Sequence, residues 1–370
     1  MIEIIFIVLS LFVFYSTLIV FSNMFWKYSS FENIKNKNLS ILIPARNEEK
    51  NIKNCIDSII NTNKNFNEII IYDDHSTDST RKEIEKLIKI NNKIKIAQTK
   101  ELEKGWTGKS FACYELAKQS SSEWIIYIDA DTTVLEDLSQ LIDYAKENRL
   151  SMLSAWPKIE MKSFSEKIFM PLLNFIVFTT CPMFIAKKRK SDNLGLAHGA
   201  CILFRKETYK KLGGHKLVRN DLFEDTRLAR IFRLKGENTY CVNGSKIISV
   251  KMYDSFSSIW NGFKKNYYPS FSKDISFFLF QFIFIISYFV APLVYFSSIF
   301  LNLNKELAIF LLCFNFVPII IINLKFKYNL LSIFTHPFGI LAMFFLGIDS
   351  WKNMKYGKGL FWKDRIYEKS

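Results

Sequence analysis

The uneven distribution of apolar residues constrains this fold more than any other feature. Among the 370 residues, apolar side chains concentrate in the first two dozen positions and in the last hundred. Residues 2–21 form an almost unbroken apolar run of the length that crosses a bilayer. Three further apolar runs cover 275–300, 307–324 and 331–348. The sequence therefore predicts a soluble domain held between membrane segments.

The amino-terminal run, residues 1–24, is predicted to be a retained transmembrane anchor. A cleavable signal peptide would need a basic start and a small-residue cleavage site, whereas this run carries Glu3 near its start. Trp26 and Lys27 follow it and suit the headgroup region of a bilayer. The lysines beyond the run place its carboxyl end in the cytosol: Lys27, Lys35 and Lys37.

A carboxyl-terminal membrane region is predicted over 274–350, followed by a basic tail over 351–370 that should be cytosolic. Three complete spans that start in the cytosol would leave this tail outside the cell. One segment is therefore predicted to be re-entrant or interfacial, and the candidate is 331–348, which contains a His-Pro pair and two glycines.

Composition excludes several classes of site. The six cysteines show no Cys-x-x-Cys spacing, so neither a zinc site nor a disulfide framework is supported, and a reducing, cytosolic setting follows for the middle of the chain. The net charge is +15, but no nucleic-acid-binding signature accompanies the lysines. Where basic residues flank apolar runs, the expected partner is a membrane with anionic headgroups rather than nucleic acid.

The middle of the chain alternates short apolar runs with amphipathic segments, which predicts an α/β fold with a mostly parallel sheet covered by helices on both faces. Expected strands cover 39–44, 68–72, 93–97, 124–128, 152–156 and 200–204. Expected helices cover 51–60, a segment ending at 90, 110–118, 138–148 and 226–234.

Residues 168–186 form an apolar stretch that two prolines interrupt, and four basic residues follow it at 187–190. The prolines and the short length argue against a full span. We expect an interfacial element that lies on the membrane with its basic end at the headgroups. A buried pair of core helices is the alternative.

Acidic residues stand at the predicted strand ends. The 124–128 strand is followed by Asp129 and Asp131, and that spacing can direct both carboxylates into the crevice at the carboxyl edge of a parallel sheet. A hard cation such as Mg²⁺ or Mn²⁺, held by one or two carboxylates and substrate phosphates, fits this pattern. Similar clusters occur at 44–48, 73–78 and 224–225. Carboxylates gathered at one edge indicate a cation and a hydrogen-bonding ligand.

In this order the clusters read Pro-Ala-Arg-Asn-Glu, Asp-Asp-His-Ser-Thr-Asp, Asp-Ala-Asp and Phe-Glu-Asp. Together they resemble the motifs of family 2 glycosyltransferases with the GT-A fold, over roughly residues 39–265. The domain boundaries expected from this resemblance are 36–266. The resemblance implies a nucleotide-sugar donor and a divalent cation, Mg²⁺ or Mn²⁺.

The resemblance also assigns roles to individual residues. It places the nucleotide-sugar pocket at the first two motifs and at Asp129, and the metal at Asp131, while Asp225, beside Glu224, becomes the general base for the acceptor. A helix amino-terminal acid is the alternative for Asp225. The residues expected to bind the nucleotide sugar are Pro44, Arg46, Glu48, Asp74, Lys109, Asp129 and Lys264.

Two residues of that set are lysines, and each belongs to a motif of its own. Lys109 lies in Gly-Lys-Ser, which imitates a phosphate-binding P-loop, but Glu103 occupies the position where that motif needs glycine. In the family this loop lies against the nucleotide. Lys264 lies where processive members carry Gln-x-x-Arg-Trp, a motif absent here. The replacement resembles that of enzymes that glycosylate carotenoid or hopanoid-type lipids, and Lys264 would help to neutralise the diphosphate.

The predicted function is that of a membrane-bound, inverting, non-processive glycosyltransferase. It would move one sugar, by default from UDP-glucose, to a carotenoid or other isoprenoid lipid at the cytosolic face of the cell membrane, which it crosses several times. A polyprenyl-phosphate or diacylglycerol glycosyltransferase is an alternative that differs only in its acceptor. A non-catalytic membrane scaffold with the same fold is a more distant alternative, which has no need for the acids.

Overall fold

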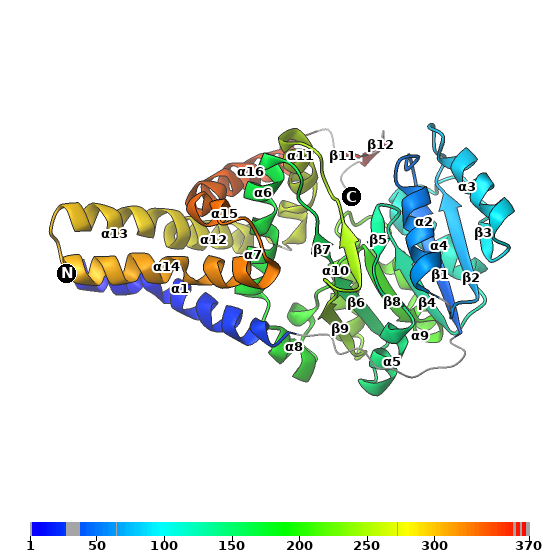
Figure 1. The fold of residues 1–370 in the computed structure, drawn as a ribbon, viewed down its shortest axis with the longest axis horizontal. Coiled ribbons are helices and arrows are strands. Elements are labelled where there is room, and N and C mark those ends of the chain that lie inside the picture. Colours follow the sequence, from blue (N-terminus) through cyan, green and yellow to red (C-terminus); the bar gives the residue numbers. More distant parts are fainter. Residues whose placement is uncertain are drawn as a thin grey trace.

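The computed structural model describes residues 2–26, 38–63, 65–271 and 273–357, together with the backbone of 360–362 and 365–367. The expectations for Lys27, Lys35 and Lys37, and those for residues 358–359, 363–364 and 368–370 of the basic tail, fall outside the described residues. The molecule is elongated, with a sheet domain at one end and a bundle of long helices projecting from the other (Figure 1).

The sheet domain is built on seven strands in the order β3-β2-β1-β4-β8-β6-β9. Neighbours from β3 to β4 are parallel, as are β6 and β9, whereas β8 runs antiparallel to both β4 and β6. The predicted mostly parallel sheet is confirmed, with one reversed strand. The strands are β1 (Leu39–Ala45), β2 (Glu68–Asp73), β3 (Ile94–Ile96), β4 (Trp124–Ile128), β6 (Met152–Trp156), β8 (Cys201–Arg205) and β9 (Thr239–Asn243).

Helices cover both faces of this sheet (Figure 1) because successive side chains of a strand point to opposite faces. Ile41 and Ile43 pack into the core cluster that contains α2 (Ile52–Thr62) and α3 (Thr80–Ile90), while Leu42 packs into the cluster on the other face. The remaining helices around the sheet are α4 (Gly108–Gln119), α5 (Gln140–Glu147), α9 (Lys206–Leu212) and α10 (Glu224–Leu234).

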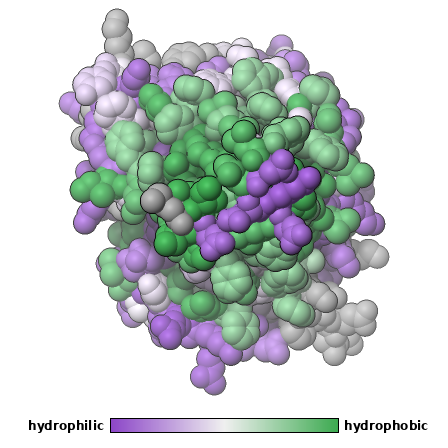
Figure 2. All heavy atoms as spheres, turned by 90° about the vertical axis from the view of Figure 1, so that its left-hand side faces the viewer, coloured by the Kyte–Doolittle hydropathy of each residue, from purple (hydrophilic) through white to green (hydrophobic). Residues whose placement is uncertain are grey.

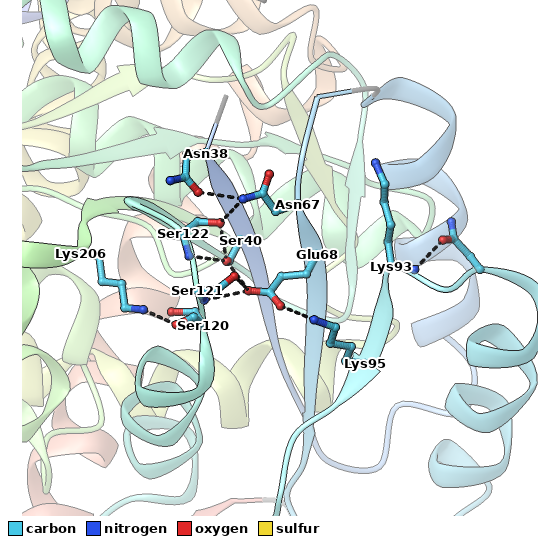
Figure 3. Close-up of polar contacts among 11 residues, drawn as sticks. Asn38, Ser40, Asn67, Glu68, Lys93, Lys95, Ser120, Ser121, Ser122 and Lys206 are labelled. Atoms are coloured by element: carbon cyan, nitrogen blue, oxygen red, sulfur yellow. Dashed lines mark hydrogen bonds and ion pairs between the residues drawn. The ribbon is translucent and has the colours of Figure 1, made fainter. Parts of the chain in front are cut away.

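A polar network closes the amino edge of the sheet, opposite the acid clusters (Figure 3). Glu68, which is 3% exposed at the start of β2, accepts hydrogen bonds from Ser40 Oγ at 2.7 Å and Ser121 N at 2.8 Å. Lys95 Nζ lies 2.9 Å from Glu68 Oε2. Burial raises the pKa of Glu68, but these hydrogen bonds outweigh burial and lower it to about 2. The network joins the amino ends of β1, β2, β3 and β4.

Smaller sheets lie beside the main one. One contains β5 (Thr132–Val134), β10 (Ile248–Val250) and β7 (Lys158–Ile159), in the order β5-β10-β7. It brings the segment after Asp131 next to the chain that leads to α11 (Phe256–Asn266). Near the carboxyl terminus, β11 (Leu360–Trp362) pairs with β12 (Arg365–Tyr367).

In the part of the chain that the structure describes, three helical segments are long and apolar enough to cross a bilayer: α1 (Ile2–Met24), the continuous segment Asp274–Phe300 and α14 (Lys305–Phe326). The second comprises α12 (Asp274–Ile285), the π-helical segment η4 (Ile286–Val290) and α13 (Ala291–Phe300). Figure 2 shows that apolar side chains cover most of the bundle end of the molecule. Exposed apolar residues such as Leu11, Phe296 and Phe310 account for this surface.

The predicted 331–348 segment forms α15 (Leu331–Phe334) and the first part of α16 (His336–Tyr356). Among the described residues, α16 is not one of the helices apolar enough to span, and it carries Asp349, Lys352 and Lys355 near its end. It packs against α11 and α12, between the bundle and the sheet domain (Figure 1).

Residues 168–186 form the end of α6 (Phe164–Phe169), then α7 (Pro171–Thr180) and part of α8 (Met183–Lys188). Helix α7 is largely buried between the sheet domain and the bundle, and Phe175 packs edge-to-face on Tyr288 at 4.8 Å. The exposed apolar residues of this stretch, Phe184 and Ile185, belong to α8.

The expectation that Trp26 faces the lipid headgroups is wrong. Trp26 is 3% exposed, because its indole packs on Phe178 at 5.3 Å and its Nε1–H donates to Cys241 O at 2.9 Å. The end of α1 is therefore fixed to the sheet domain. One continuous apolar core extends from the sheet through α7 into the bundle.

Candidate active site

The acid clusters meet because of strand direction. β1, β2 and β4 are parallel, so their carboxyl ends lie at the same edge of the sheet. β8 is antiparallel to β4, and its amino end therefore lies beside the carboxyl end of β4, where Asp129 N donates to Ala200 O at 3.3 Å. Helix α10 begins close by, with Glu224 and Asp225 in its first turn.

Gly199 lies where these elements converge. A Cβ atom at Gly199 would lie 2.8 Å from Lys109 Nζ, 3.4 Å from Asp129 Oδ2 and 3.6 Å from Asp225 Oδ2. The backbone N–H of Gly199 donates to Asp225 Oδ2 at 2.8 Å. Three of the charged residues singled out in the sequence thus surround a single backbone position, and only glycine leaves room for them.

Lys109 joins the two acidic motifs. Its Nζ lies 2.9 Å from Asp129 Oδ1 and 3.1 Å from Glu224 Oε1. Burial lowers the pKa of Lys109, but the two carboxylates outweigh burial and hold that pKa well above its usual range. The side chain begins at α4, whose amino terminus is capped by Thr107 Oγ1 accepting from Ser110 N at 3.3 Å. Lys109 is therefore a fixed cation at the carboxyl end of β4.

Asp225 is in a different electrostatic state. Burial, followed by the neighbouring Glu224, raises its pKa to about 7, although hydrogen bonds from Thr226 N and Gly199 N oppose the shift. Its Oδ1 accepts from Thr226 N at 2.6 Å. Asp225 is thus both an acid in the first turn of a helix and a carboxylate that can exchange a proton near neutral pH.

Cys55, a buried residue of α2, shows that a second group of acids converges on the same edge. Burial and then the carboxylates of Asp131, Asp129 and Glu48 raise the pKa of its thiol. Cys55 Sγ lies 3.7 Å from Asp129 O. Asp129 therefore links Glu48 and Asp131 on one side to Lys109 on the other.

The first two motifs hold each other in place. Pro44 is the register partner of Tyr72, and Asp74 N donates to Ala45 O at 2.8 Å. Arg46 Nη1 donates to Asp74 O at 2.6 Å and to His75 O at 3.1 Å, so this guanidinium binds backbone carbonyls of the loop after β2. Asp74 is 5% exposed.

Lys264 lies apart from these residues. Its Nζ lies 2.9 Å from Asp349 Oδ1, and Trp260 Nε1 donates to Asp349 Oδ2 at 3.0 Å. This contact joins α11 to α16. The neighbouring Lys265, rather than Lys264, lines the cavity described next.

A cavity of about 560 Å³ extends from the acids toward the bundle. Asp129, Glu224 and Asp225 line its polar part. Its apolar part is lined by residues of α7, α11, α12 and α16: Leu173, Ile176, Val177, Phe263, Phe280, Met343 and Leu346. A helix apolar enough to cross the membrane, α12, thus contributes to the same cavity as the acids.

Sequence reasoning missed the apolar wall and two polar residues of this cavity, Arg230 and Asn266. No motif marks them, because they come from helices far apart in the chain. Two histidines near the site pack on aromatic rings, His198 on Trp156 and His215 on Tyr127. Burial lowers the pKa of His198 to about 4 and that of His215 to about 3, so both are neutral at pH 7.

Residues 40–213, which hold the first three motifs and Gly199, match the family model described as glycosyl transferase family 2. Residues 40–213 form a family 2 glycosyltransferase domain. The resemblance drawn from the four acidic motifs is thereby confirmed for the part of the chain that the family model covers.

The chain is 28% identical over 238 residues to 4,4'-diaponeurosporenoate glycosyltransferase of Staphylococcus aureus, a match that covers 63% of this chain and 62% of that protein. The match thus spans less than two thirds of the relative's length. The mannosyltransferase PcManGT of Pyrobaculum calidifontis, solved with GDP-Man and Mn²⁺, superimposes with a TM-score of 0.56 over 96% of this chain and 99% of that one, at 14% identity. The predicted GT-A fold, with apolar helices at both ends, is confirmed.

The family 2 domain offers a sparse donor set for a cation. Within the described parts of the chain, no three His, Cys, Asp or Glu residues form a metal cluster. At the Asp-Ala-Asp motif, Asp129 forms an ion pair with Lys109. Mg²⁺ and Mn²⁺ need few protein ligands when substrate phosphates complete the shell, so the residues present fit a cation that binds together with the nucleotide.

Proposed function

We propose that this protein is a membrane-bound, inverting, non-processive glycosyltransferase that moves one sugar from a nucleotide-sugar donor to a lipid acceptor. The single observation that carries the proposal is the cavity, whose polar part contains Asp225 and whose apolar part includes Phe280 of a helix able to cross the membrane. A water-soluble acceptor has no need for such a wall, whereas a lipid can enter along it from the bilayer.

The donor is proposed to bind along the carboxyl ends of β1, β2 and β4, where open α/β sheets bind their ligands. Support comes from the convergence of Glu48, Asp129 and Asp131 around Cys55 and from the position of Asp74 beside Ala45. The similar PcManGT was solved with GDP-Man, which is a nucleotide sugar. UDP-glucose is the donor that we propose to test first.

The acceptor is proposed to be a carotenoid or another isoprenoid lipid. The relative from Staphylococcus aureus is named for transfer to diaponeurosporenoate. The apolar wall formed by α7, α11, α12 and α16 suits an extended hydrocarbon chain, because each buried methylene group stabilises the bound lipid by about 0.8 kcal/mol. We further propose that the sheet domain lies at the cytosolic face.

The transfer is proposed to be a direct displacement at the anomeric carbon. Asp225 takes the proton of an acceptor hydroxyl, and its pKa of about 7 makes the carboxylate a base that is half ionised at neutral pH. Gly199 N–H and Thr226 N orient that carboxylate. Lys109 holds Asp129 and Glu224 in place and supplies positive charge near the departing diphosphate.

Asp131 is proposed to hold Mg²⁺ or Mn²⁺ together with the donor diphosphate. A bound cation of this kind neutralises charge that develops on the leaving group. PcManGT, which shares the fold, was solved with Mn²⁺.

Asp225→Asn tests the proposed base. The amide oxygen can keep one of the two backbone hydrogen bonds, from Gly199 N or from Thr226 N, so the fold and donor binding are expected to persist while transfer is lost. Membranes that contain the protein are incubated with several labelled nucleotide sugars, and the glycosylated lipid is identified by mass spectrometry. Glu207, the exposed ion-pair partner of Arg205, provides the matched control: Glu207→Gln should leave transfer unchanged. Full turnover by Asp225→Asn would contradict the assignment, and no product with any donor would favour a non-catalytic scaffold.

A further inference from the structure

The cavity contains a cation without a matching anion. Arg230 of α10 lines it, and the guanidinium forms no ion pair with any acid in the described part of the chain. The hydrogen bond from Arg230 Nε to Gly195 O is a long one, at 3.4 Å. The carboxylates of Asp192 and Asp225 act on Arg230 only from beyond ion-pair distance.

The position of Arg230 is built into the fold. A Cβ atom at Gly195 would lie 2.8 Å from Arg230 Cγ and 2.8 Å from its backbone nitrogen, so glycine at 195 lets the arginine lie against this segment. Arg230 is half-buried, and burial lowers its pKa. A guanidinium stays charged in proteins, and holding that charge away from water without an acid partner costs free energy.

A second polar group in the cavity also lacks a partner. Asn266 ends α11 and lines the same cavity, and its Oδ1 is buried without a hydrogen-bond partner among the described residues. Buried polar atoms of this kind are rare unless a ligand or water satisfies them. Both groups stand in a cavity with a mostly apolar far wall.

We propose, building on the proposed function, that the acceptor is an anionic lipid, an apolar chain that ends in a carboxylate or a phosphate, and that Arg230 binds this anion. Arg230 follows Asp225 by five residues on α10, a rise of about 7.5 Å along the helix. Both side chains line the same cavity, so one anion there can face the guanidinium with one oxygen and Asp225 with another. A neutral lipid such as diacylglycerol would not provide the anion that Arg230 binds.

The chemistry balances for either anion. An oxygen of the carboxylate or phosphate forms a bond to the anomeric carbon, the bond from that carbon to the diphosphate breaks, and its electron pair leaves with the nucleoside diphosphate. A carboxylic acid that enters the apolar cavity protonated gives its proton to Asp225, and Arg230 stabilises the resulting anion. The product is a sugar ester or a glycosyl phosphodiester, respectively.

Binding without turnover tests this proposal. The purified full chain in detergent is titrated with two matched pairs of probes, retinoic acid with retinol and farnesyl phosphate with farnesol, at pH 8. Binding is read as quenching of tryptophan fluorescence, because Trp156 lines the cavity. Partition of each probe into detergent is the same for every variant, so the ratio of wild-type to variant affinity reports on the protein.

Arg230→Gln is expected to weaken the binding of at least one anionic probe tenfold or more, because one charge-assisted hydrogen bond is lost. The affinity for the two alcohols should change less than twofold. Arg230→Lys should restore most of the loss. The control is Arg227→Gln, one turn earlier on α10, whose side chain is exposed and lies 3.8 Å from Asp221. If Arg230→Gln loses affinity only for retinoic acid, the acceptor is a carboxylate. If it loses affinity only for farnesyl phosphate, the acceptor is a phosphate.

Equal weakening of acids and alcohols by Arg230→Gln would overturn the proposal, since it would reveal a structural role. The wild-type protein provides a test that does not depend on any variant folding: equal affinity for each acid and its alcohol would also overturn it. The proposed function fails separately. If Arg230 is needed for anion binding but no donor gives sugar transfer, the glycosyltransferase activity is refuted and the anion site is supported. If sugar is transferred to alcohols and anions are not preferred, only the anion site is refuted.

Discussion

The backbone N–H of Gly199 donates to Asp225 Oδ2 at 2.8 Å across 26 positions of sequence. Gly199 precedes the reversed strand β8, and Asp225 belongs to the first turn of α10. The bond fixes one carboxylate oxygen of Asp225 on the strand edge that also carries Asp129. The position of the Asp225 carboxylate therefore depends on a residue without a side chain.

Gly199→Ala should abolish or strongly reduce transfer while the protein stays folded. The new methyl group would lie 2.8 Å from Lys109 Nζ, and the flexible lysine side chain can move away. Its displacement would disturb the ion pairs with Asp129 and Glu224. Transfer rates and the thermal unfolding midpoint, measured on the same preparation, check this.

Gly236→Ala is the matched control for that substitution. Gly236 has a φ of +87°, and a methyl group added there would have no atom within 4 Å, so the substitution should cost about 1 kcal/mol of stability through backbone strain and leave transfer intact. Wild-type activity in Gly199→Ala would show that the convergence of Lys109, Asp129 and Asp225 has no catalytic meaning.

Transfer to an alcohol acceptor should depend on pH with a midpoint near 7. The ionised form of Asp225 is the base, and its raised pKa of about 7 means that the active form is lost as pH falls through that value. The specificity constant should fall about tenfold per pH unit below about 6 and level off above about 8. A profile that stays flat down to pH 5 would contradict the raised pKa of Asp225 or its role as the base.

Asp131→Ala should remove the metal dependence of UDP binding. In the wild-type protein Mn²⁺ is expected to tighten UDP binding at least tenfold, and chelation by EDTA should reverse this. The variant should bind UDP weakly and equally with and without Mn²⁺. Glu136→Ala, an acid beyond β5, serves as the control. Metal-dependent binding that survives Asp131→Ala, measured by calorimetry, would place the cation elsewhere.

Glu68→Gln should lower the free energy of unfolding by about 1–2 kcal/mol at pH 7, because it weakens the charge-assisted hydrogen bonds in Figure 3. The pKa of Glu68 is about 2 in the folded protein and about 4.3 in an unfolded chain. Its stabilisation is therefore present above pH 4.3 and is lost as pH falls toward 2.

The thermal unfolding midpoints of the wild-type protein and of Glu68→Gln, measured from pH 7 to pH 3, should approach each other as the pH falls. Glu85→Gln removes the exposed partner of Arg81 and should change stability by less than about 0.5 kcal/mol at any pH. If the unfolding midpoints of the wild-type protein and of Glu68→Gln differ by the same amount at every pH from 7 to 3, the charge of Glu68 does not stabilise this edge of the sheet.

Local pattern was sufficient for most strands and helices of the sheet domain. Met152–Trp156 begins and ends as predicted, and Trp124–Ile128 ends at the acid motif. The direction of β8 could not be predicted, because an apolar strand has the same sequence pattern whether it pairs parallel or antiparallel. The burial of Trp26 was missed for a related reason, since a tryptophan after an apolar run suits both a headgroup and a protein partner.

The alternation of strands and helices, the apolar helices at both ends and the acidic motifs can be predicted from the sequence, because each follows from residues close together in the chain. What these motifs face depends on contacts between segments that are far apart in the chain. Pairing of β8 with β4 brought Gly199 to Asp129, and packing of α7, α12 and α16 extended the cavity toward the bundle. Arg230 acquired its position there because contacts between distant segments, rather than any local pattern, set the shape of a cavity.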